Sequence, residues 1–405
     1  MKEIPMLDLK LEYEYMKSDI DSAIQKCLDH QKWIFGPEVK MLEEAIAKYL
    51  NVKNCIGCSS GTEALVLSLR ALAIKTKGQE YFDKSDLIIT TPFTFTATGD
   101  AILRSGATPV FVDIDPVTYN IDPVRIREAL VRSKESVVKS STTHSSPFTP
   151  HGSQVVGLLP VHLYGQSCQM DEIMAIAEEH KLFVVEDIAQ AFGGTWKGKK
   201  LGSIGATGCF SFFPSKNLGG FGDGGMVSTS DDQLNDLMRM LLKHGGKDKY
   251  NVDHIGYNAR LDTLQAAVLL AKFKYIDEFN DRRRKIAELY NDGLKGLEGL
   301  VLPLTPCSSP LNDSCHVYHQ YTIRVPSGKR DSFQKHLSDK GVSTMIYYPF
   351  PLHKMKVFGD GRSKTFGSLE LSEKAAVEVV SLPVEPLMLE EDVQSVIQAI
   401  KGFSF

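Results

Sequence analysis

Five short apolar runs alternate with helical stretches through the first half of the chain, and this alternation limits the possible folds most strongly. The apolar runs lie at residues 87–90, 109–113, 155–161, 182–187 and 208–213. A stretch with helical spacing at 171–181 lies between two of them, as a crossover helix should. Continuous apolar runs of this length are typical of strands that are buried on both faces. The sequence therefore predicts an α/β fold with a mainly parallel sheet, which binds ligands at the carboxyl ends of its strands.

The chain is long enough for more than one domain. Because 405 residues exceed the size at which one core usually stops growing, we expect a large and a smaller domain. From about residue 263 the sequence predicts long helix, followed by a half-buried strand at 319–325 and a closing helix at 390–403. We place the boundary near residue 280. Residues 1–280 then form an N-terminal segment and the large domain, and residues 281–405 form a small α+β domain.

Two polar segments interrupt this organisation. Residues 139–154, KSSTTHSSPFTPHGSQ, and residues 307–313, CSSPLND, are rich in Ser, Thr and Pro. Such segments can bury little apolar surface, so we predict that both are exposed insertions. A phosphorylation or partner site is the alternative for the longer segment.

Composition excludes several classes of partner. Lys and Arg number 46 against 50 Asp and Glu, a formal net charge of −4, without the basic surplus that is typical of nucleic-acid binding. The first residues contain no apolar core like that of a signal peptide, and no apolar run reaches the length of a membrane span. We therefore predict a cytoplasmic protein that binds neither nucleic acid nor membrane.

Seven scattered cysteines, an odd number, favour reduced thiols over disulfides. Cys55 and Cys58 form the motif CIGC, which could be a redox or metal pair. No second pair or nearby histidine completes a metal site, so packing in the core beside a loop is the favoured interpretation. We predict no bound metal.

Lys216 is the most unusual residue, because it lies between an apolar strand and a glycine-rich loop in FSFFPSKNLGGFGDGG, residues 210–225. A buried ammonium is costly without a partner. Several residues at other strand ends or helix starts could surround it, although each alone has an ordinary explanation as a cap or a core residue. These residues are Ser60, Gly61, Thr62, Phe95, Asp187, Gln190 and Ser211.

Together these residues match what pyridoxal 5′-phosphate (PLP) requires of a protein. Lys216 supplies the amine for a Schiff base, and Asp187 supplies a carboxylate for the pyridinium nitrogen. The turn at residues 60–62, with Ser211, supplies a phosphate cradle at a helix N-terminus, and Phe95 supplies an apolar face for the ring. The sequence excludes two other nucleotide-binding motifs. The loop GGFGDGG is not a dinucleotide-binding GxGxxG motif, because it leads into a strand and not a helix, and the phosphate-binding motif GxxxxGK[ST] does not occur.

The chain resembles the DegT-type nucleotide-sugar aminotransferases over nearly its whole length. The matching segments, in the family's order, are IPMLDLK, IFGPEV, SSGTEAL, GATPVFVDIDPVTYNID, PVHLYGQ, EDIAQAFGG, SFFPSKNLGGFGDGG, NARLDTLQAAVL and YPFPLHK. This resemblance implies PLP fold type I, the aspartate-aminotransferase fold, with a mainly parallel seven-stranded sheet in the large domain. It also implies a transfer of an amino group, usually from glutamate, to a keto group of a nucleotide-linked sugar.

The resemblance assigns roles to the candidate residues. Lys216 would bond to the cofactor and later move a proton between it and the substrate carbon, while Asp187 would keep the pyridinium protonated. Gln190 would bond near the ring's phenolic oxygen, and Phe95 would stack on the ring. Asn258 would reach the phosphate of the neighbouring subunit's cofactor, which implies a homodimer with shared active sites. The remaining phosphate contacts would come from Ser60, Gly61, Thr62 and Ser211.

Within the family, the pattern is most similar to enzymes that aminate C3 of a UDP-linked 2-acetamido-3-keto-hexuronate, which supply precursors of lipopolysaccharide or other surface glycans. In these relatives Arg260 would anchor the sugar carboxylate from the partner subunit; alternatively, it holds its own turn to Asp262. The chain departs from these relatives where they commonly read HYP, because it has Tyr347 and Tyr348 before its proline. The histidine expected at the substrate is therefore missing, and we predict that Tyr347 and Tyr348 contact the sugar instead. The chain also has Ile188 in place of the usual alanine.

Three other functions remain open at this point. A C4-aminating enzyme for UDP- or dTDP-keto sugars would share every cofactor residue. A sugar dehydratase of the same fold would have histidine in place of Lys216, so the lysine argues against it. A regulatory or binding protein that keeps the fold without turnover would have no need of both Lys216 and Asp187.

Overall fold

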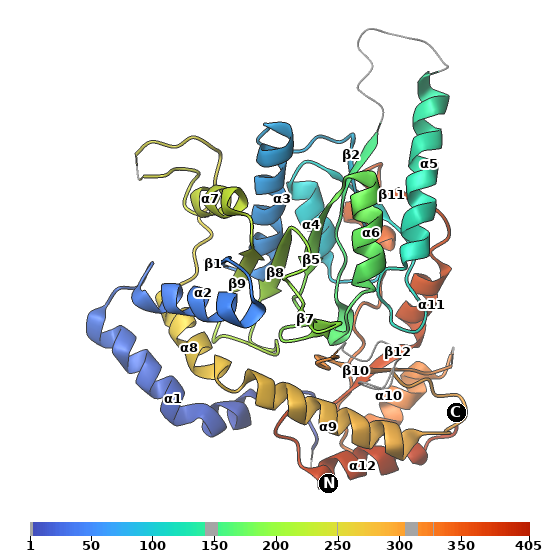
Figure 1. Ribbon diagram of the computed structural model, residues 1–405. Helices are drawn as coiled ribbons and strands as arrows, with labels where there is room; N and C mark the ends of the chain where they lie inside the picture. The colour runs from blue at the N-terminus through green and yellow to red at the C-terminus, as the bar shows by residue number, and fades with distance from the viewer. Residues whose placement is uncertain (1–2, 142–152, 249, 304–314, 327) are drawn as a thin grey trace.

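The protein is described by a computed structural model that covers residues 3–141, 153–248, 250–303, 315–326 and 328–405. Its centre is a sheet with the strand order β1-β9-β8-β5-β4-β2-β3-β11 (Figure 1). All neighbours in the sheet are parallel except β9, which is antiparallel to both β1 and β8. The strands are β1 (Asn54–Cys58), β2 (Asp86–Thr90), β3 (Thr108–Phe111), β4 (Gln154–Leu158), β5 (Phe183–Asp187), β8 (Thr207–Ser211), β9 (Gly225–Thr229) and β11 (Lys364–Thr365).

The mainly parallel sheet confirms the predicted fold class, and one detail differs from the prediction. Seven strands come from residues before 230, and the two-residue strand β11 adds an eighth from the C-terminal part. A strand of two residues has no periodicity to detect. Cys55 and Cys58 are buried in the core, and Cys58 is the last residue of β1 before a loop, as the favoured interpretation of CIGC predicts.

Helices cover both faces of the sheet because successive strand residues point in opposite directions. Leu87 and Ile89 of β2 pack in one core cluster, and Ile88 between them packs in the other. The first cluster is closed by α2 (Pro37–Leu50), α5 (Pro123–Ser141), α6 (Met170–His180) and α8 (Thr263–Phe273). The second is closed by α3 (Gly61–Lys77), α4 (Thr96–Arg104), α7 (Asp232–Leu241) and α11 (Glu370–Glu378).

The C-terminal residues form a smaller α+β unit with its own core. Strands β10 (Tyr321–Arg324) and β12 (Val379–Leu382) pair antiparallel and pack with α10 (Arg330–Asp339) and α12 (Glu390–Lys401). Both chain ends lie next to this unit in Figure 1. A short hairpin of β6 (Thr195–Trp196) and β7 (Lys199–Lys200) and three 3₁₀ turns, 163–165, 352–354 and 356–358, complete the described elements.

The predicted long helix after residue 263 is two helices, α8 and α9 (Ile276–Leu294). Residue 280, our proposed domain boundary, lies inside α9. Ile276 packs in a core cluster of the large sheet, whereas Ile286, Tyr290 and Leu294 pack in the core of the C-terminal unit. We therefore still propose that the chain changes domain within α9.

The N-terminal helix α1 (Leu9–His30) packs along α8 through Met16 and Ile20. Residues 142–152 of the longer polar segment and all of 307–313 lie outside the described residues, so their predicted exposure stays a prediction. Among the described helices, none combines the length and the apolar character that a membrane crossing needs.

Candidate active site

Lys216 lies in the loop that connects β8 to β9, at the carboxyl end of β8. Its backbone N–H donates to the Phe213 carbonyl at 2.8 Å. The next residue, Asn217, is buried, and its Nδ2 donates to Asn280 Oδ1 at 2.8 Å and to the Val317 carbonyl at 3.2 Å. A Cβ at Gly219 would lie 2.3 Å from the Pro214 carbonyl oxygen, so the loop closes this tightly only with glycine. The loop is thus fixed on both sides of Lys216.

The carboxylate of Asp187 is at the carboxyl end of β5, the neighbour of β8. Only 4% of Asp187 is exposed, and Thr98 Oγ1 donates to its Oδ2 at 3.0 Å. The Ala189 backbone N–H donates to Oδ1 at 3.1 Å. Burial raises the pKa of Asp187, opposed by these hydrogen bonds and by the charge of Lys216. A positively charged partner would therefore stabilise the carboxylate further.

The surroundings of Lys216 favour a neutral amine. Burial lowers the pKa of Lys216 to about 8, and the nearby Asp187 only partly opposes this. Within the part of the chain that the structure describes, Nζ forms no hydrogen bond or ion pair. An amine without a partner, beside a buried carboxylate, is the arrangement that a covalent carbonyl cofactor requires.

The residues of the predicted phosphate cradle come together where the start of α3 meets the end of β8. Ser60 is the N-cap of α3, and its Oγ accepts from the Glu63 N–H at 3.1 Å. The N–H groups of Gly61 and Thr62 begin the helix and have no intrahelical partner. A Cβ at Gly61 would lie 2.7 Å from Ser211 Cβ, so the predicted cradle residues do meet.

Gly225 makes this cradle possible from the other side. A Cβ at Gly225 would lie 2.3 Å from the carbonyl carbon and oxygen of Ser60, closer than any side chain tolerates. The strand β9 therefore packs directly against the start of the cradle.

Gln190 lies near Asp187 in a buried hydrogen-bonding arrangement with two tyrosines. Its Oε1 accepts from the Tyr164 backbone N–H at 2.7 Å, and its Nε2 donates to the Tyr348 hydroxyl oxygen. Phe95, which we predicted to stack on the cofactor ring, is 59% exposed and immediately precedes α4. It is three residues before Thr98, whose hydroxyl contacts Asp187, and its stacking on the ring stays a prediction.

The segment with Asn258 and Arg260 runs beside the end of β1. Ser59 donates its backbone N–H to the Ala259 carbonyl at 3.0 Å, which brings the segment next to the phosphate cradle of its own chain. Arg260 Nε donates to Asn258 Oδ1 at 3.0 Å, and its Nη2 donates to the same oxygen. In the described residues Arg260 bonds Asn258 and forms no ion pair with Asp262, the partner that the alternative interpretation gives it.

A second buried carboxylate, that of Glu186, lies at the same end of β5, where the sequence places two acidic residues in succession. Glu186, one residue before Asp187, accepts hydrogen bonds from the Gly202, Ile204 and Gly205 backbone N–H groups at 2.8–3.0 Å. Its Oε2 is 3.1 Å from His162 Nε2. Burial opposes ionisation, but the hydrogen bonds from His162 and the backbone hold the pKa of Glu186 below its ordinary value. Because it faces away from the cofactor residues, Glu186 fixes the loop after β7 and not the site itself.

One described cluster has the composition of a metal site, formed by Cys27, His30 and Glu38. His30 Nδ1 accepts from the Lys32 backbone N–H at 3.0 Å, so neutral His30 carries its proton on Nε2. That nitrogen lies 3.1 Å from Glu38 Oε1 and donates to it. A metal ligand would need a free lone pair on Nε2. The cluster is therefore a hydrogen-bonded pair beside a thiol. The six described cysteines are free.

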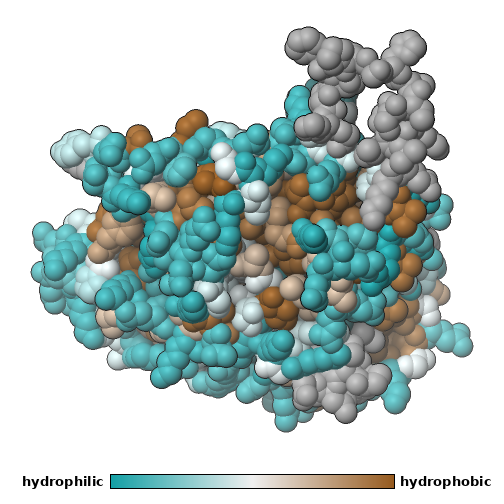
Figure 2. Space-filling model, turned by 45° about the horizontal axis from the view of Figure 1, so that its top comes forward, coloured by the Kyte–Doolittle hydropathy of each residue, from teal (hydrophilic) through white to brown (hydrophobic). Residues whose placement is uncertain are grey.

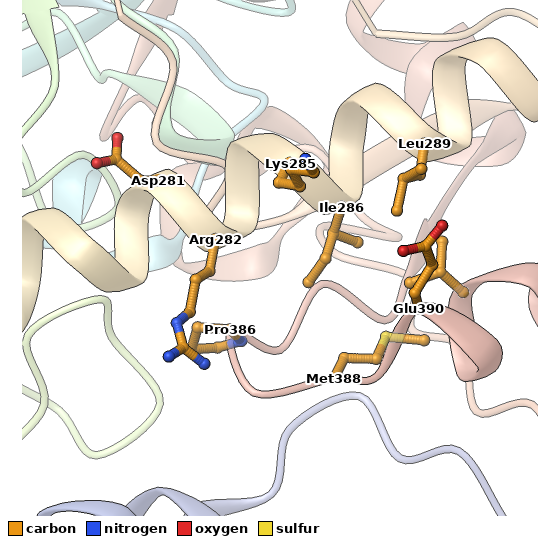
Figure 3. A pocket seen from close by; sticks show the side chains of 9 residues that line it. Asp281, Arg282, Lys285, Ile286, Leu289, Pro386, Met388 and Glu390 are labelled. Carbon is orange, nitrogen blue, oxygen red and sulfur yellow. The ribbon is translucent and has the colours of Figure 1, made fainter.

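A pocket of about 380 Å³ lies between α9 and the segment that leads into α12 (Figure 3). Charged side chains such as Arg282 and Glu390 lie around an apolar floor that includes Ile286 and Met388. It contains none of the predicted site residues, so we do not assign it to the cofactor.

The geometry therefore accommodates PLP. Among the described residues the Lys216 amine has no hydrogen-bond or ion-pair partner, Asp187 has a buried carboxylate, and the cradle is too tight for any side chain at Gly225. Comparison with known proteins agrees. Residues 14–401 match the DegT/DnrJ/EryC1/StrS aminotransferase family.

The chain belongs to this family. It is a PLP-dependent sugar aminotransferase. The chain is 42% identical to the pleiotropic regulatory protein of Geobacillus stearothermophilus, over 99% of this chain and 98% of that protein. It is 39% identical to the UDP-N-acetyl-3-dehydro-α-D-glucosamine 3-aminotransferase of Acidithiobacillus ferrooxidans, over 98% of this chain and 97% of the relative. It is also 37% identical to the UDP-2-acetamido-2-deoxy-3-oxo-D-glucuronate aminotransferase of Pseudomonas aeruginosa, over 95% of this chain and 96% of that relative.

The fold of this aminotransferase superimposes on a solved structure over nearly the full length of both chains. DesV of S. venezuelae, crystallised with a ketimine intermediate, superimposes with a TM-score of 0.86 at 36% identity, covering 99% of this chain and 98% of DesV. The predicted fold type I is thereby confirmed.

Proposed function

We propose that this aminotransferase moves the amino group of glutamate to C3 of a UDP-linked 2-acetamido-3-keto-hexuronate, a step in making a surface-glycan precursor. Two relatives named for C3 amination of UDP-linked 2-acetamido sugars support the acceptor class. The observation that favours a uronate is Arg260, whose backbone pairs with Cys58 just before the cradle and whose guanidinium bonds only Asn258 among the described residues. A guanidinium with donors to spare can hold a carboxylate in two places.

Each residue of the site would have a separate role in the reaction. Neutral Lys216 would attack the cofactor carbonyl and would later carry the proton between the cofactor and the substrate carbon. Asp187 would hold a proton on the ring nitrogen, and the N–H groups of Gly61 and Thr62 would bind the phosphate. The bound PLP supplies an electron sink and carries the amino group between the two substrates. Glutamate leaves as its 2-oxo acid, and the sugar ketone becomes an amine.

The site is proposed to be shared between two copies of the chain, with Asn258 of one copy reaching the phosphate bound by the other. Large apolar side chains that are 42–53% exposed favour such an assembly, because isolated soluble chains rarely expose many of them together. They include Trp33, Ile34, Phe35, Phe213 and Phe221. Figure 2 shows one face of the molecule, where hydrophobic patches lie between hydrophilic side chains.

The test is a kinetic comparison of two acceptors that differ only at C6, the UDP-linked 3-keto-hexuronate and the corresponding neutral hexose. We expect the wild-type protein with PLP and glutamate to aminate the uronate with the higher kcat/KM. Arg260→Gln should raise the KM for the uronate by roughly 10- to 100-fold, the effect of losing a charged hydrogen bond, and leave the KM for the neutral sugar unchanged.

Other outcomes would replace this proposal. Equal effects of Arg260→Gln on both sugars would mean that Arg260 does not hold the uronate carboxylate, and a higher wild-type kcat/KM for the neutral hexose would assign that sugar instead. Turnover only with 4-keto sugars would place the chain among C4-aminating enzymes. Cofactor binding without turnover of any keto sugar would favour a regulatory role, which the name of the Geobacillus stearothermophilus relative suggests for that protein.

A further inference from the structure

The Gln190 side chain has a fixed orientation, because one of its neighbours can only donate. A side-chain amide offers one acceptor oxygen and two N–H donors. The Tyr164 backbone N–H lies 2.7 Å away, and a backbone N–H cannot accept, so the atom that faces it is the amide oxygen. The amide nitrogen then donates one proton to the Tyr348 hydroxyl oxygen. One N–H of Gln190 remains to donate elsewhere.

The two tyrosines that hold this amide have an uncommon backbone. Tyr164 has φ of 59° and Tyr348 has φ of 65°, both in the left-handed region that non-glycine residues rarely adopt. Residues held in such conformations gather at functional sites, where the surrounding structure enforces them. Gly165, with φ of 98°, continues the unusual backbone after Tyr164.

Aromatic packing enforces the position of Tyr348. Its ring stacks on Tyr164 with centroids 6.4 Å apart and lies edge-on to buried Phe93 at 5.9 Å. Tyr164 in turn contacts Tyr119 at 5.8 Å. Gln190 itself is 6% exposed, so solvent cannot easily replace its partners. Tyr164, 26 positions before Gln190, and Tyr348, 158 positions after it, thus fix the orientation of the Gln190 side-chain amide.

We propose that Tyr348 is a positioning residue, which together with the Tyr164 backbone orients Gln190 so that its remaining N–H serves the ring oxygen of PLP. This differs from our sequence-based prediction, in which Tyr348 contacts the sugar. The inference rests on the proposed placement of the cofactor at Lys216. It does not depend on which sugar is aminated.

The test is a pH titration of the absorbance of the bound cofactor in Tyr348→Phe, which keeps the ring and removes the hydroxyl. A hydrogen bond to the ring oxygen weakens the hold of that oxygen on the proton shared with Lys216. Without an oriented Gln190, the absorbance midpoint should rise by about half to one pH unit, the shift that corresponds to one neutral hydrogen bond. Tyr348→His, which restores an acceptor atom, should bring the midpoint back toward the wild-type value.

Two further variants separate positioning from a general structural effect. Tyr119→Phe removes a hydroxyl from the same aromatic group, but one that does not bond Gln190, and should leave the midpoint unchanged. In a Gln190→Ala background, Tyr348→Phe should add no further shift, because a positioning residue acts only through its partner. An unchanged midpoint in Tyr348→Phe, or full additivity with Gln190→Ala, overturns the proposal.

Failure of this inference is distinguishable from failure of the proposed function. A Lys216-dependent absorbance band in the wild type with no response to Tyr348→Phe leaves the aminotransferase intact and removes only the role of Tyr348. No band in the folded wild type would instead contradict the cofactor site, and with it this inference.

Discussion

Lys216 and Asp187 both lie where burial disfavours their charged forms. Burial lowers the pKa of the lysine and raises that of the aspartic acid. Two such groups side by side are stabilised by a ligand that is positively charged next to Asp187 and reactive toward an amine next to Lys216. PLP has both properties, so the protein without cofactor holds a destabilised site that binding relieves.

The lowered pKa of Lys216 predicts how cofactor coupling depends on pH. A lysine attacks a carbonyl only after it loses its proton, and the pKa of about 8 lies well below the ordinary 10.5. The rate at which cofactor-free protein couples PLP should therefore rise with pH and level off above about 8. Stopped-flow absorbance between pH 6.5 and 10.5 measures this. A rate that is still rising steeply at the upper end would contradict the lowered pKa.

Thr98 provides a second prediction at the residue scale, because its hydroxyl donates to Asp187 Oδ2. Thr98→Val should weaken PLP binding by roughly 10- to 100-fold, since a hydrogen bond to a charged group contributes about 1.5–3 kcal/mol. Fluorescence titration gives the dissociation constant. Thr90→Val is the matched control, because Thr90 donates to the Leu159 carbonyl and not to Asp187. Equal losses in the two variants would assign Thr98 a purely structural role.

At the scale of elements, the cradle depends on how closely β9 approaches the start of α3. Gly225→Ala should destabilise the protein by about 1–3 kcal/mol, because the new Cβ would meet the Ser60 backbone at 2.3 Å. It should also weaken PLP binding more than its loss of stability alone explains. Urea unfolding and PLP titration measure the two effects.

The control for Gly225→Ala is Gly402→Ala, at the end of α12. There the nearest atoms to a new Cβ lie at 3.5 Å, an ordinary contact. We expect little change in either measurement. Unaltered PLP binding in a folded Gly225→Ala protein would mean that the cradle still binds the cofactor when β9 lies farther from the Ser60 backbone.

The sequence was sufficient for elements with a strong local pattern and insufficient for pairings across the chain. Buried parallel strands such as β2 and β5 have continuous apolar runs, so they could be predicted. Strand β1, NCIGC, has a mixed composition that does not predict a strand, and its pairing with β9 identifies it as one. The break between α8 and α9 at Lys274–Tyr275 contains no glycine or proline, so the sequence does not predict it.

The same distinction holds for the site. Lys216, Asp187 and the cradle residues follow strands or begin a helix, so their positions could be predicted. Thr98 lies 89 positions before Asp187, and its bond to the carboxylate depends on how α4 packs. The role of Tyr348 depends on the left-handed backbone at Tyr164, which no residue type there indicates.

At the scale of the whole molecule, the proposed sharing of active sites between two copies of the chain predicts that two defective variants can complement each other. Lys216→Ala and Asn258→Asp homodimers should each be nearly inactive, the second because it places a negative charge near the phosphate. After mixing and exchange of subunits, half of the dimers contain one site with neither substitution. Activity should then recover to roughly a quarter of the wild-type value.

Differently tagged subunits report whether exchange has occurred. No recovery of activity despite copurified mixed dimers would mean that Asn258 serves the cofactor of its own chain. Its position beside Ser59, through the bond to the Ala259 carbonyl, makes this the alternative to exclude.

The most direct test of the account is the absorbance spectrum of the purified protein with added PLP, compared with that of Lys216→Ala. The account predicts a near-visible band in the wild type that glutamate bleaches, and no such band in a Lys216→Ala protein with the same circular dichroism. A variant that keeps the same band and the same response to glutamate would show that Lys216 is not the residue that bonds the cofactor.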